Sequence, residues 1–385
     1  MKILMLNYEF PPVGGGAANE CAYILKEFGK RDDLSVDLVT SSANRFEVDV
    51  TGNTRIFKLD VHKKDLHYWT MREVAEWSLK AYIFAKRLAR RGRYDVCHCW
   101  FGWSSGLIGY RLRHKMPYIV ALQGSDVPGY SSRLEKFDKL MFKPLSRLVW
   151  RHASAVIPNS EGLKELALQT LRCEMEVICN GVDTAQFKPG NKKNSKGKVR
   201  LISTGRLIER KGYDYLIKAL QGLRNFELTL IGEGDQEERL KNLASSLNVP
   251  VNFLGRLEHD EIPAQLQDAD VFVLQTLNEG MSNSVLEAMA CGLPVVTTDV
   301  GGTRELVRQG EDDINNREKR GNIEIRCNGV IVEKGSVESL RAALNRLDRK
   351  TIRNMGRKSR EIAEEFSWSK MAEGYVEIYE MCLGG

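Results

Sequence analysis

Apolar residues follow two alternating patterns along most of the chain. Short, nearly uninterrupted apolar runs, such as "KILMLNY" at residues 2–8 and "DVFVLQ" at residues 270–275, have the length and composition of buried strands. Amphipathic helical patterns separate these runs, for example at residues 17–30 and 72–90. Because strands that are apolar on both faces occur in parallel sheets covered by helices, the alternation predicts an α/β protein with parallel sheets.

The alternation is interrupted at "KPGNKKNSKGK", residues 188–198, a polar and basic stretch that is typical of a linker. Since βα patterns occur on both sides of it, we expect two doubly wound, Rossmann-like domains. Their predicted borders are 1–185 for the N-terminal domain, 186–199 for the linker and 200–368 for the C-terminal domain. Further strands are expected at residues 35–41, 94–100, 118–123, 199–205, 227–232, 251–255 and 294–298.

The segment "EGMSNSVLEAMACGLP" at residues 279–294 directly follows one of the expected strands. Its apolar stripe predicts a helix with Ser282 or Asn283 as N-cap. Glu279 then lies in the loop before the helix, and Glu287 lies in its second turn. The backbone N–H groups at such a helix start bind anions. Two carboxylates beside an anion site fit a ligand that carries both phosphates and hydroxyls.

Three further loops at expected strand ends carry candidate binding groups. The glycine-rich "PPVGGGAAN" lets the backbone approach an anion closely, or is only a tight turn. In "STGRLIERKG", Arg206 and Lys211 converge on a diphosphate, or are two exposed surface cations. The loop "LQGSDVPGY" offers Gln123 and Asp126 as polar candidates.

Several other chemistries lack a matching pattern. The glycine-rich loop does not match the dinucleotide fingerprint, and no phosphate-binding lysine follows it, which disfavours a nicotinamide oxidoreductase. Asp268 and Asp270 match a D-x-D metal pattern, but their place before a buried strand favours a turn. His98 lies within an expected strand, where either packing or a catalytic role fits. The eight cysteines show no zinc spacing, so we expect reduced thiols and no metal site.

Composition and charge narrow the class of protein. The 42% hydrophobic and 28% charged residues fit a globular protein, and no apolar run reaches the length of a membrane span. The N-terminus reads as a strand and not as a signal peptide.

The positive charge is unevenly distributed along the chain. Residues 1–180 hold 27 Lys and Arg against 20 Asp and Glu, while the remainder holds 30 Lys and Arg against 31 Asp and Glu. The basic excess lies at residues 86–93, 111–115 and 136–151. It indicates either solvated helix faces or a surface for anionic lipid, a phosphorylated substrate or, least favoured without a motif, nucleic acid.

Together these segments resemble the retaining glycosyltransferases of the GT-B fold, family 4 (glycosyl transferases group 1). The resemblance includes the E-x7-E segment with "EAMACGLPVV", as well as "GRLIERKG", "NGVDTAQFKP", "GGTREL", "PPVGGGAA" and "FSWSKMAEGYVEIY". The segments span the whole chain in the family's order. The resemblance implies the GT-B architecture, with two Rossmann-like domains facing each other across a cleft and the C-terminal helix at 369–385 packing back on the first domain.

The resemblance also implies roles for individual residues. Arg206 and Lys211 would neutralise the leaving diphosphate, Glu279 would hold hydroxyls of the transferred sugar, and Glu287 would hold the ribose hydroxyls. Arg256 would border the base. The remaining donor-binding positions would be Gly15, Gly16, Met281, Ser282, Asn283 and Ser284. Gln123 departs from the family, in which many members carry a histidine; glutamine still forms hydrogen bonds but does not ionise.

The expected function is retaining transfer of a sugar from a UDP- or GDP-sugar, without a cofactor or metal, to a lipid-linked, polysaccharide or other cell-envelope glycan. The expected location is the cytoplasm, with peripheral contact to anionic membrane at its inner face and no nucleic-acid partner. Loops at residues 45–69 and 100–105 are expected to form most of the acceptor pocket. Two alternatives are a soluble small-molecule acceptor and a non-catalytic nucleotide-sugar-binding protein, and only Gln123 favours the latter.

Overall fold

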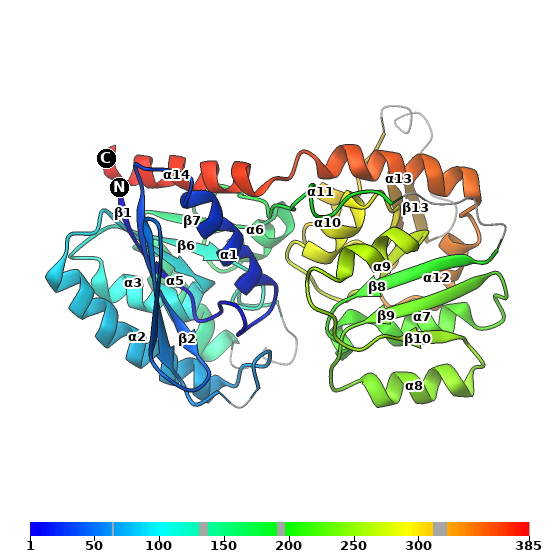
Figure 1. The fold of residues 1–385 in the computed structure, drawn as a ribbon, viewed down its shortest axis with the longest axis horizontal. Coiled ribbons are helices and arrows are strands. Elements are labelled where there is room, and N and C mark those ends of the chain that lie inside the picture. Colours follow the sequence, from blue (N-terminus) through cyan, green and yellow to red (C-terminus); the bar gives the residue numbers. More distant parts are fainter. Residues whose placement is uncertain (64, 131–137, 191–196, 311–321, 385) are drawn as a thin grey trace. The chain divides into compact units, whose positions relative to one another are not determined.

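The computed structural model describes residues 1–63, 65–130, 138–190, 197–310 and 322–384 (Figure 1). The chain forms two compact units. Unit 1 comprises Met1–Gly181 together with Trp368–Gly385, and unit 2 comprises Val182–Ser367. Each unit contains one seven-stranded sheet covered by helices.

The sheet of unit 1 has the strand order β3-β4-β2-β1-β5-β6-β7. All neighbouring strands are parallel except β3, which pairs antiparallel with β4 at the edge. The bounds are β1 (Lys2–Leu6), β2 (Ser35–Ser42), β3 (Glu47–Thr51), β4 (Thr54–Asp60), β5 (Val96–Trp100), β6 (Tyr118–Leu122) and β7 (Ala155–Pro158).

Helices cover both faces of this sheet. From β1 the chain runs through β2 to β3 and β4 at one edge, and it then crosses back to β5 on the other side of β1. Because crossovers between parallel strands are right-handed, this reversal of direction places the helices that connect the strands from β4 to β7 on the face opposite α1. One face carries α1 (Gly16–Phe28) and α14 (Trp368–Gly384), which contact each other (Figure 1). The other face carries α2 (Met71–Arg91), α3 (Gly106–Leu112) and α5 (Lys143–Arg151). A short helix, α6 (Glu161–Leu168), follows β7.

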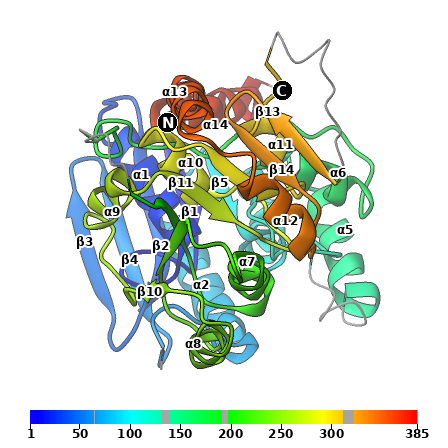
Figure 2. The same cartoon turned by 90° about the vertical axis from the view of Figure 1, so that its right-hand side faces the viewer.

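The sheet of unit 2 has the order β10-β9-β8-β11-β12-β14-β13, and β13 is its antiparallel edge strand (Figure 2). The strand bounds are β8 (Val199–Thr204), β9 (Phe226–Ile231), β10 (Val251–Phe253), β11 (Val271–Leu274), β12 (Val295–Thr298), β13 (Ile323–Arg326) and β14 (Gly329–Val332). The helices are α7 (Tyr213–Leu220), α8 (Glu237–Ser246), α9 (Ile262–Asp268), α10 (Asn283–Ala290), α11 (Thr303–Leu306), α12 (Val337–Leu344) and α13 (Arg349–Ala363).

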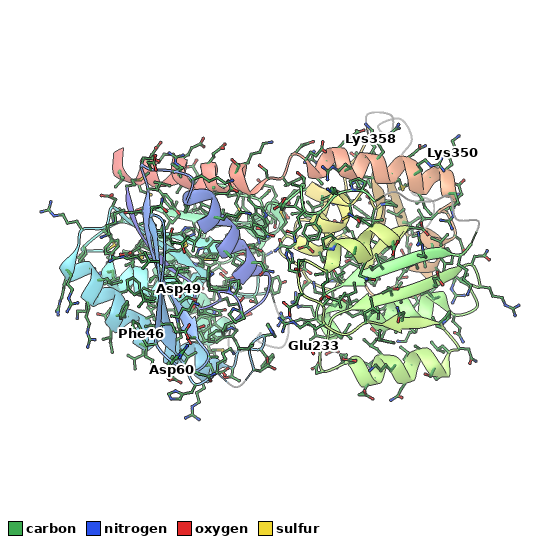
Figure 3. All side chains as sticks on the ribbon, viewed as in Figure 1. Phe46, Asp49, Asp60, Glu233, Lys350 and Lys358 are labelled. Atoms are coloured by element: carbon green, nitrogen blue, oxygen red, sulfur yellow. The ribbon has the colours of Figure 1, made fainter. Side chains whose placement is uncertain are left out.

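The predicted class of two doubly wound α/β domains is confirmed, and the strands named in the sequence analysis all form. The sheets are parallel except at one edge of each, where β3 and β13 run antiparallel to their neighbours. The β3–β4 hairpin occupies most of residues 45–69, which we expected to be loop; Figure 3 labels Asp49 on β3 and Phe46 just before it. Alternating polar residues in "EVDVT" hide this strand from a search for apolar runs.

Residues 184–187, in the segment that connects the two sheets, pack within unit 2. Phe187, inside the expected linker, is buried in unit 2, and its ring lies 5.2 Å from the ring of His259. Arg360 of α13 donates hydrogen bonds to the carbonyl oxygens of Thr184 and Phe187. Residues 191–196 of the expected linker lie outside the described residues.

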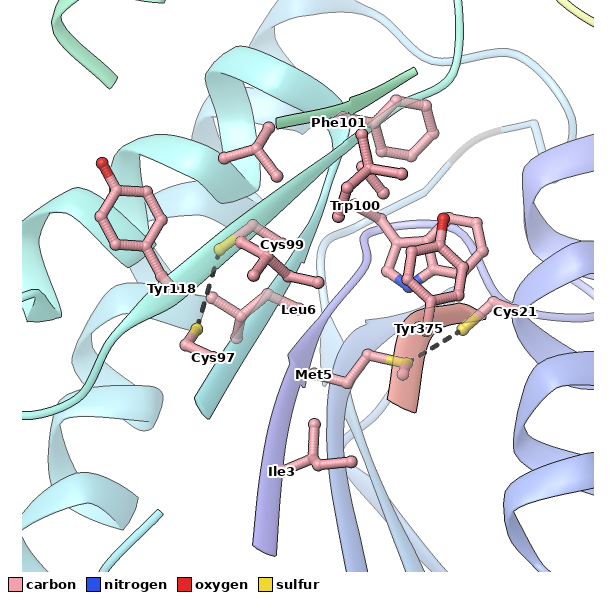
Figure 4. Close-up of a cluster of buried hydrophobic side chains, with 14 of the residues drawn as sticks. Ile3, Met5, Leu6, Cys21, Cys97, Cys99, Trp100, Phe101, Tyr118 and Tyr375 are labelled. Atoms are coloured by element: carbon pink, nitrogen blue, oxygen red, sulfur yellow. Dashed lines mark hydrogen bonds between the residues drawn. The ribbon is translucent and has the colours of Figure 1, made fainter. Parts of the chain in front are cut away.

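The last helix, α14, is held in unit 1 by aromatic side chains. The rings of Tyr23 and Trp368 stack 4.7 Å apart, and Tyr375 packs near Trp100 in the core shown in Figure 4. His98 is fully buried, and its Nδ1 lies 2.6 Å from the Tyr379 hydroxyl. Packing is therefore the role of His98.

The eight cysteines are all free thiols, and Cys97 and Cys99 point the same way with their sulfurs 3.7 Å apart. Among the described residues, no helix combines the length and the apolar content needed to cross a membrane.

Candidate functional site

In unit 2, the loops that follow β8, β9 and β11 are joined at the carboxyl edge of the sheet. The amide of Leu207 donates to the carbonyl of Glu233, and the amide of Leu277 donates to the carbonyl of Arg210. The amide of Gly302, after β12, donates to the carbonyl of Gly280 over 2.6 Å. These bonds hold the predicted site loops against one another as one platform.

Two glycines explain why this platform can close so tightly. Gly212 has φ +64°, and a β-carbon there would lie 2.0 Å from the carbonyl oxygen of Gln275. Gly301 has φ +50°, and a β-carbon there would lie 2.0 Å from the carbonyl oxygen of Glu279. Because they have no β-carbon, both glycines allow the neighbouring loops, which carry the candidate catalytic side chains, to approach this closely.

Lys211 and Glu279 form an ion pair at the centre of the platform. Lys211 lies in the short helical turn η4 (Glu209–Lys211) after β8, and its Nζ donates to Glu279 Oε2 over 2.6 Å. Lys211 is buried, and burial lowers its pKa more than the charge of Glu279 raises it. The charges of Arg210 and Arg206 lower this pKa further. The site therefore concentrates positive charge that a single carboxylate balances only in part.

Arg210, which was not among the predicted site residues, also belongs to this cluster. Its Nη1 donates to the carbonyl of Asn278 over 3.0 Å and lies 3.9 Å from Glu279 Oε1. Arg206 lies four residues before Arg210 in the loop after β8, is exposed and makes no ion pair with a described residue. The signal for Arg210 was present, because it is adjacent to Lys211 in "ERK".

The start of α10 lies directly after Glu279 in the chain. Ser282 is the N-cap, as predicted, but its hydroxyl makes no capping bond and lies 3.1 Å from the Ser284 hydroxyl. Met281 and Ser282 are buried, while Asn283 and Ser284 are half-buried. Because the capping side chain is turned away, this helix start can offer backbone N–H groups to a bound anion.

Glu287 lies in the second turn of α10, as predicted, and pairs with a histidine that we did not select. Its Oε1 lies 2.9 Å from His259 Nε2. Burial alone would lower the pKa of His259, but the hydrogen bond and charge of Glu287, with Asp260 and Asp183, outweigh burial and raise it. Arg256, three residues earlier, is exposed after β10. A His–Glu pair that joins a loop to a separate helix through tertiary structure has no signal in a single sequence.

In unit 1, the glycine-rich loop leads into α1. Gly15 is the N-cap residue of this helix, Gly16 is its first residue, and both are exposed. The Gly15 amide donates to Glu9 Oε2 over 3.2 Å, so a carboxylate already occupies one predicted anion contact. The ring nitrogen Nδ1 of His67 lies 2.8 Å from the Gly14 carbonyl oxygen and ties this loop to the segment before α2.

Gln123 and Asp126 follow β6, but only one of them is available to a ligand. Asp126 is buried and accepts hydrogen bonds from the amides of Gly102, Gln123 and Gly124. Burial raises its pKa against the effect of these amides. Asp126 is therefore a structural bridge between the loops after β5 and β6. The Nε2 of Gln123 is buried without a hydrogen-bond partner among the described residues.

A pocket of about 420 Å³ in unit 1 borders the glycine-rich loop. Its wall includes Pro11 and Pro12, the end of β2, and the cations Arg45 and Lys58 beside the hairpin. Trp100 and Phe101, expected in the acceptor pocket, are instead buried in the core. Their apolar surface packs inside unit 1, which corrects that expectation.

The second aspartate of the D-x-D pattern, Asp270, has a structural role. Asp270 lies between α9 and β11 and makes ion pairs with Arg200 at 3.4 Å and Arg349 at 3.1 Å. Burial favours the neutral acid, but hydrogen bonds and charge from Arg200 outweigh it and lower the pKa of Asp270. No group of three or more potential metal ligands occurs among the described residues.

Two family models match the chain, one for each half. The model described as "Glycosyltransferase Family 4" matches residues 14–186, and the model described as "Glycosyl transferases group 1" matches residues 184–363. The match at 184–363 includes the platform in unit 2, and the match at 14–186 begins within the glycine-rich loop, at Gly14.

Individual proteins match over the full length. The chain is 26% identical over 411 residues to an uncharacterized glycosyltransferase of Methanocaldococcus jannaschii, covering 100% of this chain and 99% of that protein. It is 25% identical to a GDP-mannose-dependent monoacylated alpha-(1-6)-phosphatidylinositol monomannoside mannosyltransferase of Corynebacterium glutamicum, covering 98% of each. Sucrose-phosphate synthase from Thermosynechococcus elongatus has a similar structure, with TM-score 0.83, 20% identity and coverage of 100% of this chain and 99% of that one.

Proposed function

Since the chain belongs to the family 4, group 1 glycosyltransferases of the GT-B fold, we propose that it transfers a sugar with retention from a nucleoside-diphosphate sugar to a glycan acceptor. The observation that carries the proposal is the cluster of Arg206, Arg210 and Lys211 around Glu279 at the start of α10. A nucleotide-sugar presents a diphosphate next to sugar hydroxyls, and this cluster offers cations next to a carboxylate.

The proposed chemistry begins with departure of the diphosphate. Breaking the bond to the anomeric carbon leaves negative charge on the phosphate oxygen, and Arg206, Lys211 and the start of α10 stabilise that charge. Fixed donors aimed at developing charge are a large catalytic contribution, typically worth about 100- to 1000-fold in rate per donor. Attack on the same face, with the leaving phosphate taking the acceptor's proton, retains the configuration. These cations supply the positive charge that the diphosphate needs, so the proposed reaction uses no metal ion.

Glu279 has two roles in this scheme. Without donor it is the counter-charge of buried Lys211, at 2.6 Å. With donor bound, the diphosphate becomes the partner of Lys211, and Glu279 accepts hydrogen bonds from the transferred sugar. The exchange keeps Lys211 paired in both states, which avoids leaving a buried charge alone.

Glu287 is proposed to hold the ribose hydroxyls, with His259 as a positioning residue. The 2.9 Å contact with His259 Nε2 holds Oε1 of the Glu287 carboxylate in place. The position of the other oxygen, Oε2, is then fixed by α10 and by His259, and this oxygen is proposed to accept hydrogen bonds from the ribose. Gly15, Gly16 and Gln123 of unit 1 are proposed to complete the donor contacts, together with Met281, Asn283, Ser284 and Arg256.

The donor is proposed to be a UDP- or GDP-sugar, and the acceptor a lipid-linked or other cell-envelope glycan. The mannosyltransferase relative supports the acceptor class, because its name specifies a phosphatidylinositol mannoside. The pocket beside Arg45 and Lys58 is a candidate for the acceptor's polar part.

A thermal-shift panel of UDP, GDP and ADP and their common sugars tests the proposal. Ligand at about 100 times its dissociation constant should stabilise the fold by roughly 2.7 kcal/mol, which raises the melting temperature by about 5–10 °C at 2–4 °C per kcal/mol. Arg206→Ala should abolish the shift, whereas Arg224→Ala should keep it, because Arg224 is exposed just before β9, at the amino edge of the sheet and opposite the platform. The stabilising nucleotide's sugars should then support transfer in the presence of EDTA. No shift with any nucleotide would contradict the proposal.

A further inference from the structure

The helices α2, α3 and α5 form one continuous layer in unit 1. They lie on the same face of the sheet, and α3 contacts both α2 and α5 (Figure 1). The helical turn η3 (Asp138–Phe142) leads directly into α5. The outer sides of these elements therefore form one surface, which we call the basic layer.

Large apolar side chains project from the basic layer into solvent. On α2, Leu79 and Ile83 are one turn apart and are 64% and 44% exposed. Leu140 and Met141 of η3 are 84% and 48% exposed, and Leu148 of α5 is 40% exposed. Single exposed apolar residues are normal, but five on adjacent elements are a mark of a contact surface. The side chains of α2 that face the sheet, such as Trp77, are already fully buried.

The same layer is free of negative charge over long stretches of sequence. Residues 77–94, 96–125 and 139–160 contain thirteen Lys or Arg and no Asp or Glu. At the end of α2, Arg87, Arg90 and Arg91 are exposed and form no ion pair with a described residue. The opposite face differs, because α14 carries three acids, Glu373, Glu377 and Glu380. The basic layer is therefore complementary to an anionic surface on this side of unit 1 only.

We propose that the basic layer docks unit 1 on an anionic lipid bilayer. The cations of α2, α3 and α5 attract the headgroups, while Leu79, Ile83, Leu140, Met141 and Leu148 enter the interface between headgroups and acyl chains. Surface binding of this kind combines electrostatic attraction with buried apolar area. A nucleic acid would match the cations but would leave these aliphatic side chains in water, so lipid is the better fit. The proposal adds a partner to the proposed transferase and does not depend on the transfer step.

Vesicle sedimentation tests the electrostatic part. The full-length protein should bind vesicles of phosphatidylglycerol and phosphatidylcholine (3:7) at low salt and should not bind phosphatidylcholine alone. Because each basic residue near an anionic surface contributes about fivefold to binding, Arg87→Gln, Arg90→Gln and Arg91→Gln together should weaken binding about 100-fold. The matched control is Arg346→Gln, Lys350→Gln and Arg357→Gln, which removes three exposed cations from unit 2 and should leave binding unchanged. Lys350 is labelled in Figure 3.

The apolar part needs variants that keep the charge. Leu79→Gln with Ile83→Gln should weaken vesicle binding several-fold and remove what remains at 0.5 M salt, where charge attraction is screened. Met381→Gln with Leu383→Gln, two exposed apolar residues of α14, should have no effect. A 30-base-pair DNA duplex serves as the competing anion, and its binding should not respond to the Leu79 and Ile83 changes.

Three outcomes would overturn the proposal: no binding to anionic vesicles at low salt, equal loss in the unit 2 control, or binding to DNA without binding to vesicles. Each variant is also tested for its nucleotide thermal shift. A variant that keeps this shift is folded, so lost vesicle binding then concerns the surface alone. Failure of the vesicle test with an intact nucleotide shift would leave the proposed transferase standing.

Discussion

At the residue scale, the pairing of Lys211 with Glu279 predicts that one substitution, Glu279→Gln, preserves or strengthens nucleoside diphosphate binding but slows sugar transfer. Glu279→Gln removes the counter-charge of a buried ammonium group while keeping the side chain's shape. A diphosphate then supplies the only strong partner for Lys211, so nucleoside diphosphate should bind at least as tightly as to the wild type. Transfer should fall about 100-fold or more, because the contact to the sugar is lost.

Calorimetry of nucleoside diphosphate binding, together with kcat for transfer, checks this prediction. Lys211→Met is the companion variant, which should weaken diphosphate binding as well as transfer. Equal loss of binding and transfer in Glu279→Gln would show that Glu279 contacts the diphosphate side of the donor or holds the fold of the loop.

A second residue-scale prediction concerns the pair of His259 and Glu287. Despite burial, the pKa of His259 is raised above its ordinary value of 6.5 by the hydrogen bond and charge of Glu287, so the ring keeps its positive charge to a higher pH than an ordinary histidine and holds Glu287 by a charge-assisted bond. As pH rises through this raised pKa, that bond weakens and donor affinity should fall. The charged groups facing the ring are Glu287 on α10, Asp260 beside it and Asp183 near the start of unit 2.

The measurement is donor KM between pH 6 and 9 for the wild type and His259→Gln. The variant should have a KM a few-fold higher at pH 6 and a flatter profile, while kcat changes little. The difference between the two profiles isolates His259 from titration of the donor's own phosphates. Parallel profiles would remove His259 from this role.

At the element scale, the turn after β12 is predicted to hold the Glu279 loop in place. Gly301→Ala adds a β-carbon where the Glu279 carbonyl oxygen already lies and also strains a backbone at φ +50°. Strain of about 1–3 kcal/mol plus overlap of similar size should lower stability and displace Glu279. The matched control is Gly222→Ala, which has φ +80° but open space around the added carbon. It carries the strain without the overlap.

Melting temperature and transfer rate separate these effects. Gly301→Ala should lose more of both than Gly222→Ala, and its transfer rate should fall more than its stability explains. If the two variants lose transfer equally, contact between Gly301 and the Glu279 loop has no special importance.

The elements also show how far sequence reasoning reaches. Runs of apolar residues locate β1, β8 and β11, because buried parallel strands must be apolar on both faces. Half-exposed edge strands such as β3 lack this signal, and their alternating polar residues resemble a loop. Loops at strand ends were located because catalytic loops follow strands in α/β folds. The His259–Glu287 contact was not predictable, since it joins positions 28 residues apart through tertiary structure.

At the scale of the whole molecule, the distribution of tryptophan allows the two units to be followed separately. The chain's six tryptophans are at positions 69, 77, 100, 103, 150 and 368. All of them belong to unit 1, and unit 2 has none. Tryptophan emission therefore reports the unfolding of unit 1 alone, while circular dichroism reports both units. Multi-domain proteins need such separate probes because a single transition is not assured.

This probe makes the buried histidine of unit 1 testable. Burial lowers the pKa of His98 to about 3, against an ordinary value of 6.5 in the unfolded chain. Between these two values the unfolded state binds a proton that the folded state does not. Stability from this group is therefore complete above pH 6.5 and is lost as pH falls toward 3. Each pH unit is worth about 1.4 kcal/mol, so unit 1 should lose roughly 2–3 kcal/mol between pH 6.5 and 4.5 from His98.

Urea unfolding followed by tryptophan emission at pH 7.0, 5.5 and 4.5 measures this loss. His98→Gln keeps a hydrogen-bonding group near the Tyr379 hydroxyl but does not titrate, so its unit 1 should be less stable at pH 7 and should depend less on pH. Because α14 supplies both Tyr375 and Tyr379 to the ring's surroundings, protonation of His98 should loosen that helix first. Hydrogen exchange of α14 that accelerates at pH 4.5 in the wild type but not in the variant would assign the pH dependence to this contact. An identical slope in both proteins would assign it to the carboxylates of unit 1 instead.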